Sequence, residues 1–271
     1  MSAGALRPNP VLARLQAGGT AYGMMAFEFF TPGLMAILAE AGAEWVVLDM
    51  EHSGAGIDSM KAQFAAARGL DIVPFVRVPG TAYHLIAPLL DAGAHGIMVP
   101  MVETREQAEQ IAAWCRYAPD GVRGLAFGMA HDDYRAGDVV QKMREANART
   151  VVIALIETAT GIANAEAIMA VPGIDIGWLG HFDLTATMGI TGQFDHPDFL
   201  AAAATLADAC AKHGKPAGIL AGTVAMAEAF RARGFRCLSY GTDIGLLQSA
   251  LSAGLAHLRK PSTEGGLSCG D

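Results

Sequence analysis

The chain has 271 residues, of which 19 are Lys or Arg and 27 are Asp or Glu, so its formal charge is −8. This acidic balance argues against a basic nucleic-acid-binding surface. Apolar residues make up 52% of the chain and charged residues 17%. Such a composition can bury a large core, which excludes global disorder. The length suits one (β/α)8 barrel or two small domains.

Cysteine spacing and hydropathy indicate the compartment. The four cysteines stand far apart and form no C-x-x-C pair, as is typical of a reduced, cytoplasmic protein; they are Cys115, Cys210, Cys237 and Cys269. Residues 1–8 contain no apolar signal-peptide core. No uncharged apolar stretch reaches the roughly 18–20 residues of a membrane span. We expect a cytoplasmic protein that acts on small molecules and has no membrane or nucleic-acid partner.

Eight short apolar runs alternate with helical patterns along the chain. Several runs are continuously apolar, as in Val151–Ile156, which is typical of parallel strands covered on both faces. The predicted strands are Tyr22–Met25, Glu44–Leu48, Ile72–Val76, Gly96–Val99, Val151–Ile156, Ile174–Leu179, Ala217–Leu220 and Arg236–Tyr240.

Amphipathic helices are predicted between these strands. Gly42 and Gly93 stand where a helix C-terminus favours a left-handed residue. The predicted helices are Gly33–Ala41, Thr81–Ala92, Glu103–Tyr117, Pro197–His213, Gly222–Arg233 and Asp243–Leu258.

Strands that alternate with helical crossovers predict an α/β fold, and eight of them fit a closed (β/α)8 TIM barrel. An open doubly wound sheet would favour a Gly-rich nucleotide turn, and no G-x-G-x-x-G is present. We expect residues 1–260 to form one barrel domain and 261–271 to form a flexible tail. The longest irregular stretch, Ala118–Gly137, is of a length that usually marks a functional or disordered loop.

Polar residues follow the strands at the end where a barrel carries its active site. They are Asp49, Glu51 and His52 after the second strand, Arg77 at the end of the third, Glu157 after the fifth, Gly180–Asp183 after the sixth, and Tyr240 and Asp243 after the eighth.

Glu157 and Asp183 follow adjacent strands and are candidate ligands of one hard cation. Oxygen ligands without Cys favour Mg²⁺ or Mn²⁺ over Zn²⁺. The alternative is that Glu157 caps the helix beginning near Gly161 and Asp183 caps a turn before Leu184.

Arg77 is a candidate clamp for a substrate carboxylate or a developing oxyanion. The alternative is an ion pair with Glu51 or Asp49. His52 lies three residues after Asp49, so we expect the carboxylate to orient the imidazole for proton transfer; a structural histidine is the alternative. No lysine ends a strand and no G-x-S-x-G occurs, which disfavours a Schiff-base aldolase and a serine hydrolase.

Several of these segments resemble the HpcH/HpaI family of metal-dependent 2-keto acid aldolases. The resemblance extends from about Leu12 to Leu258 and rests on motifs that occur in order along the chain. They are Leu48–His52, Pro74–Arg77, Leu89–Gly93, Val99–Val102, Ile156–Thr158, Gly180–Thr185 and Ala217–Ala221.

The resemblance implies a phosphoenolpyruvate/pyruvate-type barrel and a role for each matching residue. Glu157 and Asp183 match the family's ligands of Mg²⁺ or Mn²⁺, with Co²⁺ as a further candidate. Arg77 matches the arginine that holds the pyruvyl oxygen, and His52 with Asp49 matches the proton relay. The pyruvate carboxylate is implied to bind at Gly180 and Leu220. Asp91 matches an acid that reaches a neighbouring subunit's site.

The resemblance also implies the reaction and the assembly. A 4-hydroxy-2-oxo acid is cleaved reversibly to pyruvate, or a close analogue, and an aldehyde through a metal-stabilised enolate. The last helix is exchanged between subunits, commonly in a hexamer built as a trimer of dimers.

The sequence departs from the family pattern at two places. Leu155 stands where members commonly have Gln, and His181-Phe182 stands where many have Pro-Ala. Strand alternation points Leu155 to the same side as Glu157. With Phe27, Phe29 and Phe30 on the same rim, these residues predict an apolar pocket that contacts the substrate through His181 and Phe182. We expect a bulky or aromatic aldehyde.

Two other functions stay open. A CoA-thioester lyase of the citrate or malyl-CoA type would need basic residues for the CoA phosphates, and Ala118–Gly137 offers Arg123 and Arg135 against Asp120, Asp132 and Asp133. A non-catalytic barrel that binds a 2-oxo acid is the second, since Leu155 departs from the family pattern.

Overall fold

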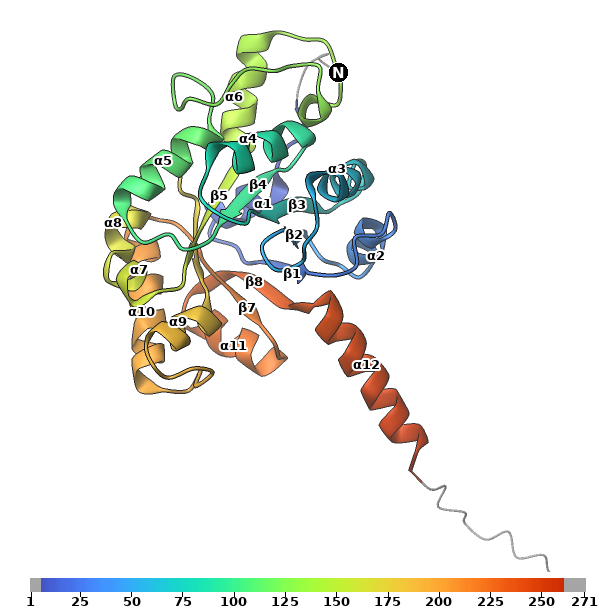
Figure 1. Cartoon of the computed structure of the whole chain (residues 1–271), viewed down its shortest axis with the longest axis vertical. Helices are drawn as coiled ribbons and strands as arrows, with labels where there is room; N and C mark the ends of the chain where they lie inside the picture. The colour runs from blue at the N-terminus through green and yellow to red at the C-terminus, as the bar shows by residue number, and fades with distance from the viewer. Residues whose placement is uncertain (1–5, 261–271) are drawn as a thin grey trace, which may run out of the picture.

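The computed structural model describes residues 6–260 as a closed barrel of eight parallel strands that alternate with helices (Figure 1). The strands follow one another around the barrel in chain order, and β8 pairs in parallel with β1. The predicted (β/α)8 barrel is confirmed and the open sheet is wrong. The strands are β1 (Ala21–Ala26), β2 (Trp45–Asp49), β3 (Val73–Arg77), β4 (Gly96–Val99), β5 (Val151–Ile156), β6 (Ile176–Leu179), β7 (Ala217–Ala221) and β8 (Phe235–Thr242).

The helices surround the strands, and the six that were predicted by range agree with the structure to within a few residues. Gly93, with φ 116°, ends α4, and Gly42, with φ 87°, follows α2, as predicted. The helices of the structure are α1 (Pro10–Gln16), α2 (Leu34–Glu40), α3 (Ile57–Ala66), α4 (Tyr83–Ala92), α5 (Arg105–Cys115), the 3-10 turn η1 (Ala130–Asp132), α6 (Val139–Arg149), α7 (Ala159–Ala163), α8 (Ala165–Met169), α9 (His181–Thr187), α10 (Pro197–Lys212), α11 (Val224–Ala232) and α12 (Asp243–Leu258). The predicted tail at 261–271 lies outside the described residues.

The core has two layers because strand side chains alternate between the two faces of the sheet. Val46 and Leu48 of β2 pack outward against the helices, whereas Trp45 and Val47 point into the barrel. Inside, Trp45 meets Trp178 edge to face at 5.8 Å. Because the interior is filled, a ligand cannot lie within the barrel, and the end at which the strands finish is where barrel enzymes bind their substrates.

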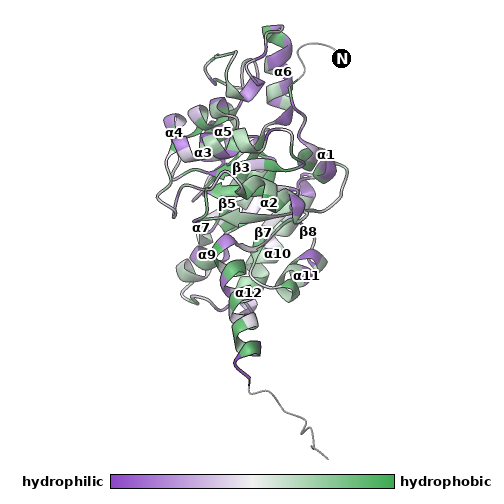
Figure 2. Cartoon of the chain, turned by 90° about the vertical axis from the view of Figure 1, so that its right-hand side faces the viewer, coloured by the Kyte–Doolittle hydropathy of each residue, from purple (hydrophilic) through white to green (hydrophobic). Residues whose placement is uncertain are grey.

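The last helix is the exception to this packing. α12 extends away from the barrel (Figure 1), and apolar turns stay uncovered along it (Figure 2). Only Asp243, its first residue, is buried. No helix among residues 6–260 combines the length and the apolarity that crossing a membrane requires.

Candidate active site

A cavity of about 350 Å³ opens at the carboxyl end of the barrel strands. Every strand, or the turn that follows it, contributes a residue to its wall. The predicted site residues that line it are His52, Arg77, Glu157, Gly180, His181, Phe182, Asp183 and Leu220. Asp49 lies beneath Arg77 and Asp91 lies elsewhere, as described below.

Glu157 is held in one orientation by the turn after β4. Only 4% of the residue is exposed, and its Oε1 accepts a hydrogen bond from the backbone N–H of Met101 at 2.9 Å. Met101 adopts φ 56°, a left-handed conformation that non-glycine residues rarely take. The helix-cap alternative for Glu157 is wrong, because Thr158 caps α7 through its hydroxyl, which accepts from Gly161 N–H at 3.0 Å.

The second oxygen of Glu157 faces Gly180. A Cβ at position 180 would lie 2.5 Å from Glu157 Oε2 and 3.1 Å from Leu155 Cδ1. The carboxylate can therefore occupy its place only because residue 180 is glycine. Leu155 and Glu157 both line the cavity, as strand alternation predicts. Asp183 is the third residue of α9 and not its N-cap, so the turn-cap alternative is wrong as well.

Carboxylates accumulate around Glu157. Burial raises its pKa to about 7 against the opposing effect of the Met101 N–H, and the carboxylates of Asp183 and Glu51 raise it further. The pKa of Glu51 is also raised, chiefly by burial, against the effect of Arg77. Without a cation, acids this close favour the protonated form.

Arg77 is the cation that faces these acids. Its Nε lies 2.6 Å from Asp49 Oδ1, and its Nη1 lies 3.2 Å from Glu51 Oε2. The parallel register of β2 and β3 places Asp49 directly beside Arg77. The Phe27 ring covers the guanidinium, with its centroid 5.4 Å from Cζ. The predicted ion pairs with Glu51 and Asp49 are thus both present, and Arg77 still lines the cavity.

Asp49 does not orient the imidazole of His52, contrary to expectation. Its two oxygens accept from the backbone N–H groups of His52 at 2.9 Å and Glu51 at 3.1 Å, and also bind Arg77. Three donors occupy the carboxylate, so it fixes the turn instead. The imidazole Nε2 lies 3.7 Å from Glu51 Oε2, and 58% of the His52 side chain is exposed at the mouth.

The apolar wall of the cavity contains only one of the three phenylalanines predicted after the first strand. Phe27 lines the cavity, but Phe29 is exposed and Phe30 packs against the outer core layer. Phe182 is 59% exposed at the mouth, and its ring lies tilted against that of His181, with the ring centroids 4.6 Å apart. Burial lowers the pKa of His181 to about 4. His181 therefore adds a neutral ring to the wall and not a charge.

Asp91 does not reach the cavity of its own chain. It lies on α4, on the outside of the barrel, where it accepts from Arg123 Nη2 at 2.5 Å. It lines a separate surface cavity between α3, α4 and the residues around η1.

The structure gives three residues of the site a role that the sequence analysis did not assign. Glu51 and Asp243 were predicted only as polar residues of the rim, with Glu51 also a candidate partner for Arg77. Met101 acts only through its backbone N–H, which donates to Glu157, and the residue type gives no indication of this role. Asp243 accepts the backbone N–H groups of Phe27, Glu28 and Phe29 at 2.8–2.9 Å and so fixes the loop after β1.

The donor set suits a hard divalent cation. Within residues 6–260 no group of three or more His, Cys, Asp or Glu side chains is close enough to hold an ion by itself. Glu157 and Asp183 form a pair, and Mg²⁺ commonly takes one or two protein carboxylates and completes its coordination with water and substrate. The carboxylates of Asp183 and Glu51 both raise the pKa of Glu157, and a cation bound between these acids would balance their negative charge.

Comparison with known proteins assigns the chain to a family that includes aldolases. The model of the HpcH/HpaI aldolase/citrate lyase family matches residues 24–250. The chain is 38% identical over 242 residues to a hydroxypyruvate/pyruvate aldolase of Chromohalobacter salexigens, covering 89% of this chain and 94% of that one. It is 35% identical over 243 residues to a 5-keto-4-deoxy-D-glucarate aldolase of Shigella dysenteriae serotype 1, and the match covers 90% of this chain and 94% of the Shigella protein.

A solved structure shares the fold closely. The HpcH/HpaI aldolase/citrate lyase family protein from Burkholderia cenocepacia J2315 superimposes with a TM-score of 0.87 at 32% identity. The match covers 93% of this chain and 100% of the Burkholderia chain.

Proposed function

Because the chain belongs to the HpcH/HpaI aldolase/citrate lyase family, we propose that it is a class II pyruvate aldolase. It reversibly cleaves a 4-hydroxy-2-oxo acid to pyruvate, or a close analogue, and an aldehyde. One observation carries the proposal: Glu157, Asp183, Arg77 and His52 line a single cavity at the carboxyl end of the barrel, where barrel enzymes have their active sites. The aldolase names of the relatives agree with this chemistry.

Glu157 and Asp183 would hold the divalent cation, for which Mg²⁺, Mn²⁺ and Co²⁺ are the candidates. Bound there, the ion supplies Lewis-acid polarisation of the 2-oxo group. Met101 keeps Oε1 of Glu157 in a hydrogen bond, so the carboxylate presents Oε2 as the free ligand atom. Glu51 adds negative charge next to the pair without being one of its members.

Arg77 stabilises the negative charge that develops when the C3–C4 bond breaks. The electron pair of that bond moves onto the pyruvyl fragment as an enolate, and a guanidinium fixed in advance stabilises it without reorganisation. The ion pairs to Asp49 and Glu51 hold Arg77 in place. Its partners also keep the guanidinium charge from being buried alone.

His52 removes the proton from the 4-hydroxyl group, which allows that carbon to become the aldehyde. The imidazole is at the mouth and accessible to substrate, and its Nε2 lies 3.7 Å from Glu51 Oε2. This proton then passes from His52 to C3 of the enolate, which gives pyruvate, and in the synthetic direction the two transfers run in reverse. Backbone groups at Gly180 and Leu220, which line the cavity, bind the pyruvate carboxylate.

The aldehyde is bulky or aromatic in this proposal. Phe27, Leu155, Trp178, Phe182 and Leu220 give the cavity a largely apolar wall. Among residues 6–260 no lysine lines it, and Arg77, the one arginine there, already pairs with two carboxylates. Kinetics with a panel of aldehydes in the synthetic direction test this. Aromatic aldehydes should have the higher kcat/KM, and a strong preference for succinic semialdehyde would contradict the assignment.

Release of pyruvate from a racemic 4-hydroxy-2-oxo acid tests the reaction itself. A coupled lactate dehydrogenase assay should detect pyruvate, a chelator should abolish its release, and Mn²⁺ or Mg²⁺ should restore it. Binding of the 2-oxo acid without turnover would contradict the aldolase and favour the non-catalytic barrel. Cleavage that depends on a CoA thioester would favour the CoA lyase.

The active assembly is an oligomer in this proposal, a hexamer built as a trimer of dimers. Asp91 lies on the outside of its own barrel, so it can contribute only to a neighbouring subunit's site. The uncovered apolar side chains of α12 provide a surface for exchange of this helix between subunits.

A further inference from the structure

A larger cavity adjoins the active-site cavity at the mouth of the barrel. Its volume is about 700 Å³, and its walls come from the loop before α10, from α11, from the end of β8 and from the first turns of α12. His181, Phe182, Leu220 and Thr242 line both cavities. Only this shared wall separates the two cavities, so a ligand bound in the active site can extend across it into the second cavity.

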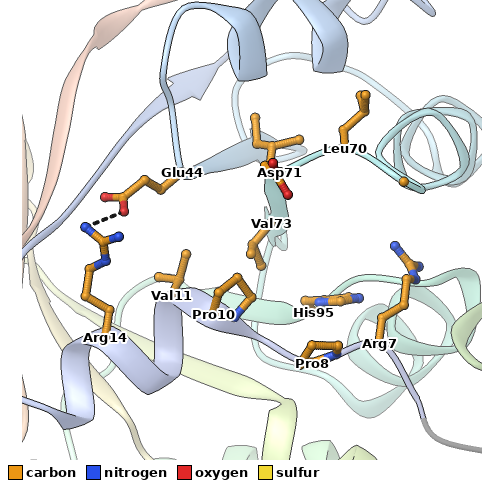
Figure 3. A pocket seen from close by; sticks show the side chains of 12 residues that line it. Arg7, Pro8, Pro10, Val11, Arg14, Glu44, Leu70, Asp71, Val73 and His95 are labelled. Carbon is orange, nitrogen blue, oxygen red and sulfur yellow. Dashed lines mark ion pairs between the residues drawn. The ribbon is translucent and has the colours of Figure 1, made fainter. Parts of the chain in front are cut away.

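Two other large cavities do not adjoin the active site. One, of about 530 Å³, lies at the opposite end of the barrel, where Glu44 and His95 precede β2 and β4 (Figure 3). The other lies beside Asp91, between α3 and α4, and shares no lining residue with the active-site cavity. A substrate held at Glu157 and Asp183 cannot extend into either of them.

The active-site cavity has little room for a large aldehyde. Its volume of about 350 Å³ is near the lower end of the roughly 300–1,000 Å³ that is typical of small-molecule sites. In the proposed reaction this space also holds the divalent cation and the pyruvyl group. A bulky substituent on the aldehyde carbon therefore has to leave the active-site cavity, and the adjoining cavity offers about twice the volume.

Aromatic rings form the junction of the two cavities. The Phe194 ring meets His181 and Phe182 edge to face, with centroid distances of 4.8 Å and 5.0 Å. Phe194 packs in turn against Phe199, and Phe199 against Phe230, which lines the second cavity. Phe182 is exposed, and exposed side chains change rotamer within nanoseconds. The junction can therefore admit an apolar group and make favourable contacts with an aromatic one.

The second cavity also presents apolar side chains that a ligand can reach. Leu200, Met226 and Leu246 line it, and each of them is partly exposed. Among residues 6–260 the charged side chains that line it are Asp195 and Arg233. Their charges are opposite, and both residues are exposed to solvent, which screens them. The cavity therefore favours an uncharged, apolar ligand.

The first turns of α12 provide a fixed wall of this cavity. Asp243 is tied to the loop after β1, and Leu246 packs against the outer core layer. Ser249, which lines the cavity, lies about 200° around the helix from both Leu247 and Leu251. The exposed apolar side chains of α12 therefore face away from the cavity, and association through them leaves it open.

We infer that the second cavity binds the distal part of the aldehyde, an inference that rests on the proposed aldolase function and specifies its substrate class. The substrate is a 4-hydroxy-2-oxo acid that carries an extended, uncharged apolar group on C4, such as a phenylalkyl chain. The reacting carbon stays beside His52, while the substituent crosses the wall at Phe182 and is buried against Phe194 and Met226. Burial of this group in the transition state raises kcat/KM.

Addition of pyruvate to three aldehydes, catalysed by the full chain with Mn²⁺, tests this inference. Propanal and 3-phenylpropanal share their first three carbons, whereas benzaldehyde carries its ring directly on the reacting carbon. We expect kcat/KM for 3-phenylpropanal to exceed that for propanal at least tenfold, as burial of a phenyl group predicts, and to exceed that for benzaldehyde.

The aldehyde series separates failure of this inference from failure of the aldolase assignment. A smaller ratio of 3-phenylpropanal to propanal, or a preference for benzaldehyde, would overturn the role of the second cavity and favour α12 of a second copy as its occupant. The aldolase assignment would stand in either case. No addition to any of the three aldehydes would overturn the aldolase assignment, and this inference with it.

Variants of α11 locate the effect in the second cavity. Ala229→Trp fills the cavity and should lower kcat/KM for 3-phenylpropanal at least tenfold, while unchanged kcat/KM for propanal shows that the variant is folded. Ala225→Glu places a charge in the same cavity and should have the same selective effect. Ala232→Trp, at an exposed position of α11 outside the cavity, is the control and should leave both values unchanged. An unchanged preference for 3-phenylpropanal in Ala229→Trp and Ala225→Glu would overturn the inference.

Discussion

Gly180 and Glu157 fit together so closely that the glycine is a requirement of the site. In Gly180→Ala the new methyl group displaces the carboxylate, since a Cβ there would lie 2.5 Å from Oε2. We expect kcat/KM for pyruvate release to fall at least tenfold, about 1.4 kcal/mol of transition-state stabilisation. Gly222→Ala is the matched control, because a Cβ at position 222 meets nothing within 4 Å. Wild-type kinetics in Gly180→Ala would show that the position of Glu157 does not limit the reaction.

His131 predicts a pH dependence of stability that is independent of the active site. Burial, with Arg123 and Arg149, lowers its pKa to about 4, below that of an unfolded histidine near 6.5. The unfolded chain therefore binds more protons between these values, and stability falls as the pH is lowered from about 6.5 to 4. The contribution of this residue is on the order of 3 kcal/mol.

Urea unfolding between pH 4.5 and 7 measures this effect. In His131→Gln the free energy of unfolding should depend less steeply on pH than in the wild type. His257→Gln, at an exposed position of α12, serves as the control and should retain the wild-type slope. An unchanged slope in His131→Gln would contradict a neutral, buried His131.

At the residue scale the sequence predicts which side chains gather at the mouth, because each follows a strand and all strands end on the same rim. It also predicts that Arg77 pairs with Glu51 or Asp49, and both pairs are present, but it does not predict the partners of His52. Asp49 was expected to orient the His52 ring, but backbone N–H groups and Arg77 occupy its oxygens. The contribution of Met101 depends on a left-handed backbone, which its side chain does not signal.

At the scale of elements, Asp243 connects α12 to the mouth of the barrel. Its carboxylate accepts the N–H groups of Phe27, Glu28 and Phe29, and Phe27 covers Arg77. In Asp243→Asn one acceptor oxygen becomes an NH2 group that faces N–H donors. Since a hydrogen bond to a charged group contributes about 1.5–3 kcal/mol, we expect a more mobile loop and a roughly tenfold lower kcat/KM.

Hydrogen exchange of the segment 27–31, together with kinetics, tests this connection. Exchange should accelerate in Asp243→Asn and remain at the wild-type rate in Asp208→Asn, an exposed control on α10. Unchanged exchange with unchanged kcat/KM would mean that Asp243 only begins the helix.

The strands and helices themselves follow from the sequence because their signals are local. Continuous apolar runs give the strands, and left-handed glycines give two of the helix ends. The helices α1, α3, α8 and α9 were not predicted. The irregular stretch Ala118–Gly137 is fixed by long-range pairs such as Arg123 with Asp91 and Lys142 with Asp132, which no local pattern encodes.

At the scale of the whole molecule, α12 contacts β1 and β8 near its start, and most of its length is exposed within residues 6–260. Ile244, Leu247, Leu251, Leu255 and Leu258 recur at intervals of three and four residues and are all exposed, so they form one apolar stripe. Exposed apolar stripes mark association surfaces. We expect the double variant Leu247→Glu/Leu251→Glu to sediment as a smaller species than the wild type.

Ala253→Glu is the control for this measurement. Residue 253 lies about 200° around the helix from Leu251, at 100° per residue, so its charge does not enter the stripe. This variant should keep the wild-type sedimentation coefficient. A monomeric wild-type protein, or a double variant that sediments like it, would contradict association through α12.

The central claim is that Glu157 and Asp183 together bind the divalent ion on which carbon–carbon cleavage depends. Mn²⁺ titration followed by electron paramagnetic resonance, on the same samples used for pyruvate release, tests it most directly. The account predicts one Mn²⁺ per chain in the wild type, and loss of both Mn²⁺ binding and pyruvate release in Glu157→Gln and in Asp183→Asn. Cleavage at the wild-type rate in either variant, or in wild type freed of metal by a chelator, would contradict it.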